Sequence, residues 1–175
     1  MNTNKRNHNL ALGAIIAALY AVLVFTQEML FPNSASAAVQ FRVSEALTVL
    51  ALFTPAAIPG LTIGCALSNL LFMGALPLDV LLGSFATFLA AVCMYKLRDF
   101  TFKGVPVAAL LMPAVFNGLI IGLEIEIFFI EGPFHFASFL VQGGLVALGE
   151  LGVLFTLGIL LYKTINNKKL QKYFK

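Results

Sequence analysis

Carboxyl, amide and guanidinium side chains interrupt the long apolar stretches of this 175-residue sequence. Carboxylates accept hydrogen bonds from N–H groups, amides both donate and accept them, and a guanidinium only donates. An ionisable group in an apolar helix costs about 2.5–3.5 kcal/mol at the helix centre, so such groups usually face a cavity and mark function. The sequence therefore predicts a site that binds a small polar solute. The candidate residues are Arg42, Glu45, Asn69, Asp79, Asn117, Glu124, Gln142 and Glu150.

Some of these residues also have a structural interpretation. Arg42 and Glu45 are three residues apart at the predicted start of a helix and can pair with each other. Asp79 can cap the helix that follows it, and the amides of the set can hold neighbouring helices together. Glu124 and Glu150 are the hardest to explain in this way, because they fall well inside predicted helices.

The same sequence offers little for catalysis or metal binding. Cys65 and Cys93 lie in apolar runs, where cysteine packs as a small hydrophobic residue. The histidines, His8 and His135, are too few for a zinc site. His135 and Ser138 form one conceivable nucleophilic pair, which nothing else in the sequence supports. We therefore expect no catalytic residue, no metal and no cofactor.

Composition places the chain in a membrane. Hydrophobic residues make up 60% of it, charged residues 11%, and the mean hydropathy is +0.95, whereas a soluble domain carries about 25% charged residues. A soluble fold of this length has too much surface to hide so many apolar side chains. The length suits one compact membrane domain over residues 1–175, with no room for a soluble ATPase.

Charged residues divide the chain into six stretches without Asp, Glu, Lys or Arg. A transmembrane helix needs about 20 apolar residues. The stretch 46–78 is too long for one helix, and Pro55, Pro59 and Gly60 break it near its middle. The last two stretches are separated only by Glu150 and join into one helix. The sequence therefore predicts an all-α bundle of six transmembrane helices, at about 9–30, 42–56, 58–74, 78–97, 104–127 and 135–163.

Basic residues gather on one side of this predicted bundle. Six helices place both termini and the loop between the fourth and fifth helices on the same side. Ten of the eleven Lys and Arg residues lie there: two near the N-terminus, three in 96–103 and five from 163 onward. The positive-inside rule therefore places both termini in the cytoplasm. The basic tail is then expected to face anionic lipid headgroups and not nucleic acid.

The acids show the opposite distribution. Seven of the eight, all except Asp99, lie in the outer loops or within predicted helices. The candidate residues thus converge on the outer half, which predicts a solute cup open to the outside and not a continuous pore. Pro113 predicts a kink beside this cup, because proline removes a backbone hydrogen bond from its helix. Glu126 and Glu131 flank a loop, where we expect both to be exposed to water.

The first predicted helix carries two tracks of small residues. Ala14 and Ala18 form one track, and Gly13, Ala17 and Ala21 form the other. Small residues four apart let another helix approach closely, which is how helices adhere in lipid. The spacing alone leaves open whether each track packs within the bundle or against another protein.

Three segments together carry a resemblance to a known family. They are VQFRVSEALTVL at 39–50, GLTIGCALSNL at 60–70 and LDVLLGSFAT at 78–87. With these segments, the chain resembles over its whole length the substrate-binding S component of an energy-coupling factor (ECF) vitamin transporter. Within that class it is most similar to the queuosine precursor transporter (QueT-like) family. The resemblance implies a transporter subunit and not an enzyme.

The resemblance also implies partners and a solute. Such S components capture a scarce micronutrient at the bacterial plasma membrane and join a coupling membrane subunit and two cytoplasmic ATPases. The chain itself lacks a Gly-x-x-x-x-Gly-Lys-Ser/Thr loop for ATP. The coupling subunit would dock on Ala14 and Ala18, and the cup would hold a deazaguanine-type base. One carboxylate would accept the adjacent N–H and amino groups of that base, and a second would suit a cationic aminomethyl substituent.

Other functions stay open at the level of sequence. An S component for another vitamin is the nearest alternative. An intramembrane enzyme would need a paired nucleophile and base or a metal set, and a membrane scaffold would leave the outer carboxylates unexplained.

Overall fold

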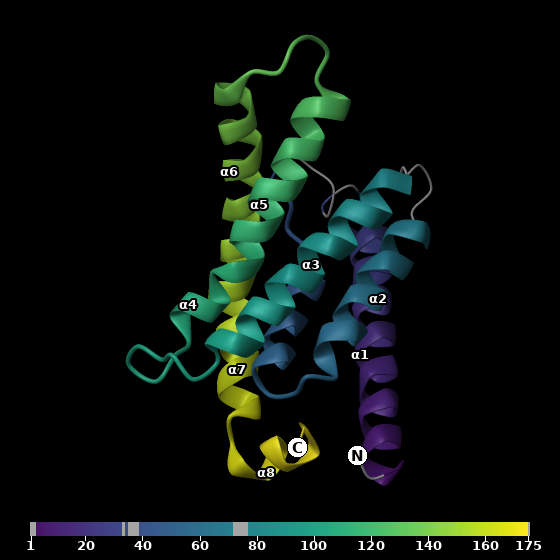
Figure 1. Cartoon of the computed structure of the whole chain (residues 1–175), viewed down its shortest axis with the longest axis vertical. Helices are drawn as coiled ribbons and strands as arrows, with labels where there is room; N and C mark the ends of the chain where they lie inside the picture. Colours follow the sequence, from purple (N-terminus) through teal and green to yellow (C-terminus); the bar gives the residue numbers. More distant parts are fainter. Residues whose placement is uncertain (1–2, 33, 35–38, 72–76, 175) are drawn as a thin grey trace.

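The computed structural model describes residues 3–32, 34, 39–71 and 77–174. Within these residues the chain is helical, and the one departure toward β structure is an isolated bridge between Phe102 and Val105. Both chain termini lie at one end of the molecule, which we call the terminal end, while the loop before α6 forms the opposite, hairpin end (Figure 1). The helices in chain order are α1 (Thr3–Leu30), η1 (Val43–Leu52), α2 (Ala57–Leu71), α3 (Pro77–Leu97), α4 (Val107–Leu110), α5 (Met112–Glu124), η2 (Ile125–Phe129), α6 (Phe136–Val153), η3 (Leu154–Gly158), α7 (Ile159–Ile165), α8 (Lys168–Gln171) and η4 (Lys172–Phe174).

These elements reproduce the predicted helical segments in order, because α4, α5 and η2 continue one another and so do α6, η3 and α7. The boundaries differ in places. The first helix begins at Thr3, six residues before the predicted start. The third was predicted to reach residue 74, and its described part ends at Leu71, since 72–74 lie outside the described residues. The short helices α8 and η4 were not predicted.

The second segment differs most from its prediction. An α-helix was expected over 42–56, whereas η1 is a 3-10 helix that ends at Leu52. Eight of its ten residues are buried, so contacts from the surrounding helices determine its conformation. A 3-10 helix rises about 2 Å per residue, so η1 extends roughly 20 Å through the middle of the bundle. Thr54 and Pro55 then turn the chain into α2, as the prolines predicted.

The fifth segment is interrupted at Leu111, two residues before Pro113, whereas a kink was predicted at Pro113 beside the cup. Leu111 forms a turn between α4 and α5, and Pro113 lies in the first turn of α5, where its missing N–H has no helical partner to lose. Further along, η2 and η3 are five-residue π-helical stretches. Such stretches arise within α-helices, often at functional sites, and the sequence analysis did not predict them.

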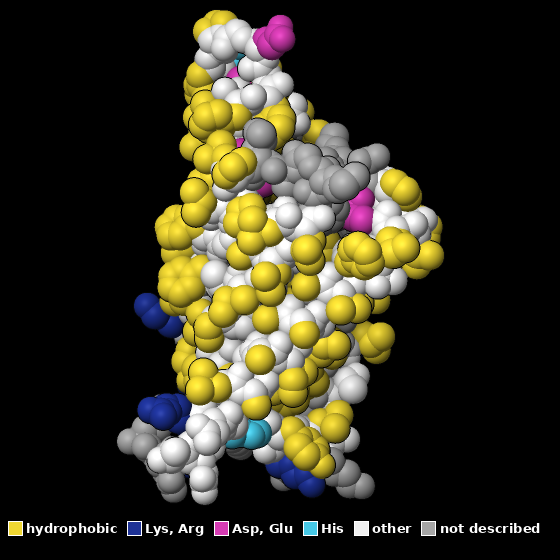
Figure 2. Space-filling model, turned by 90° about the vertical axis from the view of Figure 1, so that its right-hand side faces the viewer, with side chains coloured by type: hydrophobic (Ala, Val, Ile, Leu, Met, Phe, Trp, Pro, Cys, Tyr) yellow, Lys and Arg dark blue, Asp and Glu magenta, His cyan; other side chains and the backbone are white. Residues whose placement is uncertain are grey.

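Large apolar side chains cover the outside of the bundle. Phe25, Leu81, Leu148 and Leu160 are each more than half exposed, and extensive exposed apolar surface marks contact with lipid or protein. Among the described residues, four helices are long and apolar enough to cross a bilayer, and the shorter η1 and α2 are also apolar. On the face shown in Figure 2, apolar side chains cover most of the surface, acids lie toward the hairpin end, and Lys and Arg lie toward the terminal end.

The two small-residue tracks of α1 face different ways. Gly13 and Ala17 are buried against α2. A Cβ at Gly60 would lie 2.6 Å from the Gly13 carbonyl oxygen, so the close approach of these helices requires glycine there. Ala14 and Ala18 instead lie on the exposed face of α1. The structure therefore resolves the question for one track, which packs within the bundle.

Candidate functional site

Polar residues from six helical segments converge in the half of the bundle toward the hairpin end. Arg42, directly before η1, interacts electrostatically with Tyr20 of α1, Glu45 of η1 and Glu150 of α6. Glu124, in the last turn of α5, also interacts with Arg42. These electrostatic interactions link residues that lie more than a hundred positions apart in sequence. We call the whole group the polar cluster; its members are Tyr20, Arg42, Glu45, Asn69, Asp79, Asn117, Glu124 and Glu150.

Glu45 is held by a residue that the sequence analysis did not select. The hydroxyl of Tyr20 donates a hydrogen bond to Glu45 Oε1, and both residues are about 1% exposed. A buried tyrosine hydroxyl normally has such a partner. One signal was present in the sequence: Tyr20 lies seven residues before Gln27, which places both on the same face of α1.

Gln27 fixes the chain segment that carries Arg42 and Glu45. Its Nε2 donates to Ser34 Oγ at 2.8 Å and to the carbonyl oxygen of Phe41. Its Oε1 accepts the Val43 N–H at 2.8 Å. One side chain therefore satisfies backbone groups on both sides of Arg42, which ties the start of η1 to α1.

Glu150 and Asn117 join α6 to α5 inside the cluster. Asn117 Nδ2 donates to Glu150 Oε1 at 3.1 Å, and both residues are buried. The neighbouring Gly149 allows the backbone before Arg42 to approach, since a Cβ there would lie 2.8 Å from the Gln40 carbonyl carbon. The mid-helix carboxylate predicted from the sequence is therefore inside the cluster, beside the segment that brings in Arg42.

Asn69 makes a contact between helices. Its Nδ2 donates to the backbone carbonyl oxygen of Asp79 at 2.8 Å, and it packs so closely that a Cβ at Gly83 would lie 2.7 Å from the same atom. This hydrogen bond joins α2 to α3. The sequence analysis offered the same alternative for the amides, that they hold neighbouring helices together. The Asp79 carboxyl group meanwhile shares a side-chain hydrogen bond with Glu124.

Three carboxyl oxygens of the cluster are buried without a hydrogen-bond partner among the described residues. They are Glu45 Oε2, Glu124 Oε1 and Glu150 Oε2. A buried acceptor without a donor costs roughly 1–3 kcal/mol, and more when it is charged. Three of them in one cluster form a set of acceptors that a solute with several N–H groups would satisfy.

Gln142 and Glu126 lie outside these contacts. Gln142 is half-buried on α6, about two turns from Glu150. Glu126 is 3% exposed, so the expectation that it is solvated was wrong. Its Oε1 accepts the His135 N–H at 2.9 Å, which ties η2 to the start of α6. Glu131 is exposed, as expected.

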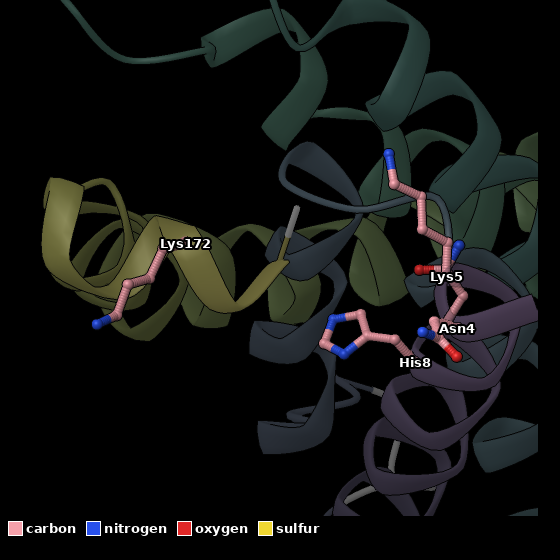
Figure 3. A pocket seen from close by; sticks show the side chains of 5 residues that line it. Asn4, Lys5, His8 and Lys172 are labelled. Atoms are coloured by element: carbon pink, nitrogen blue, oxygen red, sulfur yellow. The ribbon is translucent and has the colours of Figure 1, made fainter. Parts of the chain in front are cut away.

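A pocket of about 340 Å³ lies at the terminal end, away from the polar cluster (Figure 3). It separates the start of α1 from the C-terminal helices, and His8 Nε2 lies 3.2 Å from the Tyr173 carbonyl oxygen nearby. Its lining is basic and amide-rich, with none of the cluster residues. The residues that line it are Asn4, Lys5, His8, Asn9 and Lys172.

Catalysis and metal binding find no support in the cluster. Within the described residues, no group of three or more His, Cys, Asp or Glu side chains is arranged to hold a metal ion. Cys65 is buried beside Tyr20 and Arg42, and Cys93 is half-buried. His135 contributes its backbone N–H to Glu126, and no described hydrogen bond joins its ring to Ser138.

Comparison with known proteins places the chain among transporters. Residues 10–167 match the family described as QueT transporter. Over 150 residues the chain is 33% identical to the queuosine precursor transporter QueT of Lactococcus lactis subsp. cremoris (strain MG1363), covering 81% of this chain and 83% of that protein. No solved structure matches. With its long apolar helices, this is a multi-pass membrane protein and a transporter, not an enzyme. The chain belongs to the QueT transporter family.

Proposed function

We propose that this chain is the substrate-binding S component of an ECF importer and that it captures a queuosine precursor, a 7-deazaguanine-type base, in the polar cluster. The observation that carries the proposal is the set of three buried carboxyl oxygens that have no donor within the described part of the chain. A deazaguanine base presents an N–H and an amino group side by side, which a carboxylate accepts as a pair. Its carbonyl oxygen suits a donor such as Arg42. The relative from Lactococcus lactis bears the name of a queuosine precursor transporter, which supports this class of solute.

Within the cluster, we assign direct contacts to the solute on the grounds of burial and free acceptor atoms. Glu45, Glu124 and Glu150 supply the acceptors, and Arg42 and Asn117 supply donors. Asn69 acts mainly by holding the backbone of Asp79, whose carboxyl group interacts with that of Glu124. Gln142 lies at the rim and contributes least.

We further propose a six-span topology in the bacterial plasma membrane, with both termini in the cytoplasm and the hairpin end outside. The four long helices support spanning, and the buried position of η1 permits a shorter crossing because its backbone contacts protein and not lipid. Basic residues near the terminal end support the orientation. The polar cluster then opens toward the outside, as capture of an external solute requires.

The partners in this proposal are a coupling membrane subunit and two cytoplasmic ATPases. The docking surface is the exposed track of Ala14 and Ala18 on α1. Large neighbours such as Ile15 and Val22 are also more than half exposed there, so a partner helix would meet small residues flanked by apolar side chains. The inward track of Gly13 and Ala17 is already occupied by α2.

Binding and docking are tested separately. Calorimetry on the purified protein against deazaguanine bases and a panel of vitamins tests the solute. Tight binding of another vitamin, with no deazaguanine bound, would contradict the assignment and favour an S component of different specificity. Replacing Ala14 and Ala18 together by Trp should abolish uptake by the assembled importer and leave solute binding intact. Uptake at the wild-type rate would show that this track is not the docking surface.

A further inference from the structure

The loop between α3 and α4 exposes two aromatic side chains outside the membrane-spanning helices. Phe100 is 69% exposed and Phe102 is 66% exposed. Both lie between the apolar helical stretches Pro77–Leu97 and Val107–Phe129. Phenylalanine rings in water are unfavourable, and neighbouring exposed apolar groups mark contact with lipid or protein. We call the segment from Arg98 to Pro106 the aromatic turn.

The aromatic turn has a defined backbone shape. Phe102 and Val105 exchange backbone hydrogen bonds, at 2.8 Å from the Phe102 N–H and at 3.1 Å from the Val105 N–H. Between them, Lys103 has a φ of 50° and Gly104 a φ of 78°, as in the type I′ turn of a two-residue β-hairpin. Val105 packs against the apolar core, and so does Leu97 at the end of α3. The tip of the turn therefore projects from a fixed base.

The direction in which the turn projects favours lipid over water. It extends sideways from the bundle and not beyond the terminal end, where α8 and the N-terminus lie (Figure 1). A Cβ at Gly104 would meet nothing within 4 Å, so the tip is open on that side. Because α1 and α6 run along the length of the molecule (Figure 1), a sideways projection lies along the membrane surface.

Positive charge lies beside the two rings. Lys96 and Lys103 are exposed, and Lys103 Nζ lies 5.6 Å from the centroid of the Phe102 ring. In the described part of the chain, the one acid of this loop pairs with its arginine, with 3.7 Å between Arg98 Nε and Asp99 Oδ2. The lysine charges are therefore left for other groups. Basic residues directly beside a membrane helix favour anionic lipids, and a lysine reaches phosphate groups while its apolar stem stays in lipid.

We propose that the aromatic turn is a membrane anchor, which inserts its two phenylalanine rings among the upper parts of the lipid chains and holds anionic phosphate headgroups with its two exposed lysines. Apolar rings next to basic side chains suit this boundary, where the chains meet the headgroups. The anchor goes beyond the proposed function and requires only that α3 and α5 cross a membrane. It fixes the depth of these two helices, which carry members of the polar cluster at their opposite ends.

The experiment measures the depth of the turn by fluorescence. The sequence contains no tryptophan, so a single introduced tryptophan reports its own surroundings. Phe100→Trp and Phe102→Trp are each reconstituted as the full-length protein in vesicles of phosphatidylcholine and phosphatidylglycerol. Lipids brominated high on their chains should quench most of the emission of both variants, whereas lipids brominated near the chain ends and iodide in the water should quench little.

Two controls calibrate this result. Phe88→Trp lies near the middle of α3, at a position that is 41% exposed, and should be quenched best by lipids brominated near the chain ends. Glu131→Trp lies in the exposed loop at the hairpin end and should be quenched by iodide and not by brominated lipid. This second control shows whether tryptophan enters the lipid by its own affinity.

The Phe102→Trp reporter also measures the preference for anionic lipid. At equal amounts, brominated phosphatidylglycerol should quench it about twofold more than brominated phosphatidylcholine. Lys96→Gln together with Lys103→Gln should make the two lipids equal. Lys5→Gln together with Arg6→Gln removes the same charge from the start of α1 and should leave the preference unchanged.

Three results would overturn the inference. Quenching of both turn reporters by iodide, with none by brominated lipid, would place the turn in water. Protection from iodide and from brominated lipid alike would mean that another copy of the chain covers the turn. Equal quenching by the two headgroup types, with all lysines present, would exclude anionic lipid as the partner. Each of these results leaves the proposed solute untouched, since no solute is present in the measurement.

Discussion

The two ends of η1 belong to different kinds of interior. Its first turn carries Glu45 into the polar cluster, where acids, amides and a guanidinium meet. Its last turn carries Leu50 and Leu52 into an apolar core that also includes Leu110, Tyr162 and Ile165. After it, the Phe53 ring lies 5.7 Å from the ring of Tyr162. A single ten-residue helix therefore connects the site to the region that supports it.

The two halves differ in how their interiors are stabilised. In lipid, apolar burial gains little, because the lipid is as apolar as the core, so the terminal half is stabilised mainly by close packing. The polar half contains buried carboxyl oxygens that no described residue donates to, and such oxygens lower stability. A fold selected for stability alone would fill this half like the other, which is why we propose a binding role for its polar atoms.

The largest effect should come from the carboxylates of the polar half. Glu150→Gln and Glu45→Gln should each weaken binding of a deazaguanine base by about 10- to 100-fold, since each removes a hydrogen bond between charged groups. Calorimetry on the purified variants measures this change. Their thermal stability should not fall, because each change replaces a buried ionisable carboxyl group by a neutral amide whose oxygen can accept the same hydrogen bond. Unchanged affinity in both variants would show that these groups do not contact the solute.

The apolar half should respond in the opposite way. Leu110 is fully buried in the core. Leu110→Ala should lower the free energy of unfolding by about 2 kcal/mol. This is the low end for a buried leucine, because only packing and not transfer from water is lost. Kd for the base should stay within about twofold of wild type, since a change distant from the ligand adds independently.

Leu119→Ala supplies the control for this change, because Leu119 is 54% exposed on the same helical segment. Thermal unfolding in detergent compares the two variants. A large loss of affinity in the Leu110 variant would show that the two halves are not separable.

Sequence reasoning identified the polar half because a charge in an apolar helix is conspicuous. It found Glu45, Glu124 and Glu150 through this contrast, and the structure brings all of them into one cluster. It missed Tyr20, because a tyrosine in a membrane helix is ordinary until its hydroxyl is seen to meet a carboxylate. It misplaced Glu126, whose burial depends on the backbone of His135 across the turn.

The backbone was predicted in order but not in detail. Prolines set the breaks near Pro55 and Pro113 because their effect is local. The 3-10 geometry of η1 follows from burial on nearly every side, which depends on helices distant in sequence. The small-residue tracks of α1 also depended on helices distant in sequence. The spacing of small residues predicted both tracks, but the position of α2 was needed to show that the inner track packs within the bundle.

A smaller effect is expected from the residue that holds Glu45 in place. Tyr20→Phe removes the hydrogen bond to Glu45 Oε1 and should weaken base binding by about three- to tenfold, since the carboxylate loses its fixed orientation. Calorimetry measures the change. Tyr173→Phe is the control, because that ring is 58% exposed near the terminal end. Equal affinities of the two variants would show that Glu45 does not need Tyr20 for its position.

The smallest effect should mark the edge of the site. Asn117 and Gln142 look alike in sequence, as lone amides in apolar helices. Of these two amides, Asn117 alone donates to a cluster carboxylate among the described hydrogen bonds, so Asn117→Ala should weaken base binding by about threefold or more. Gln142→Ala should change base binding by less than about twofold, because the Gln142 side chain is half-buried about two helical turns from Glu150. If Gln142→Ala were the more damaging change in the same titration, the solute would bind closer to the hairpin end than the carboxylates suggest. The proposed binding site would then have to include the part of α6 around Gln142.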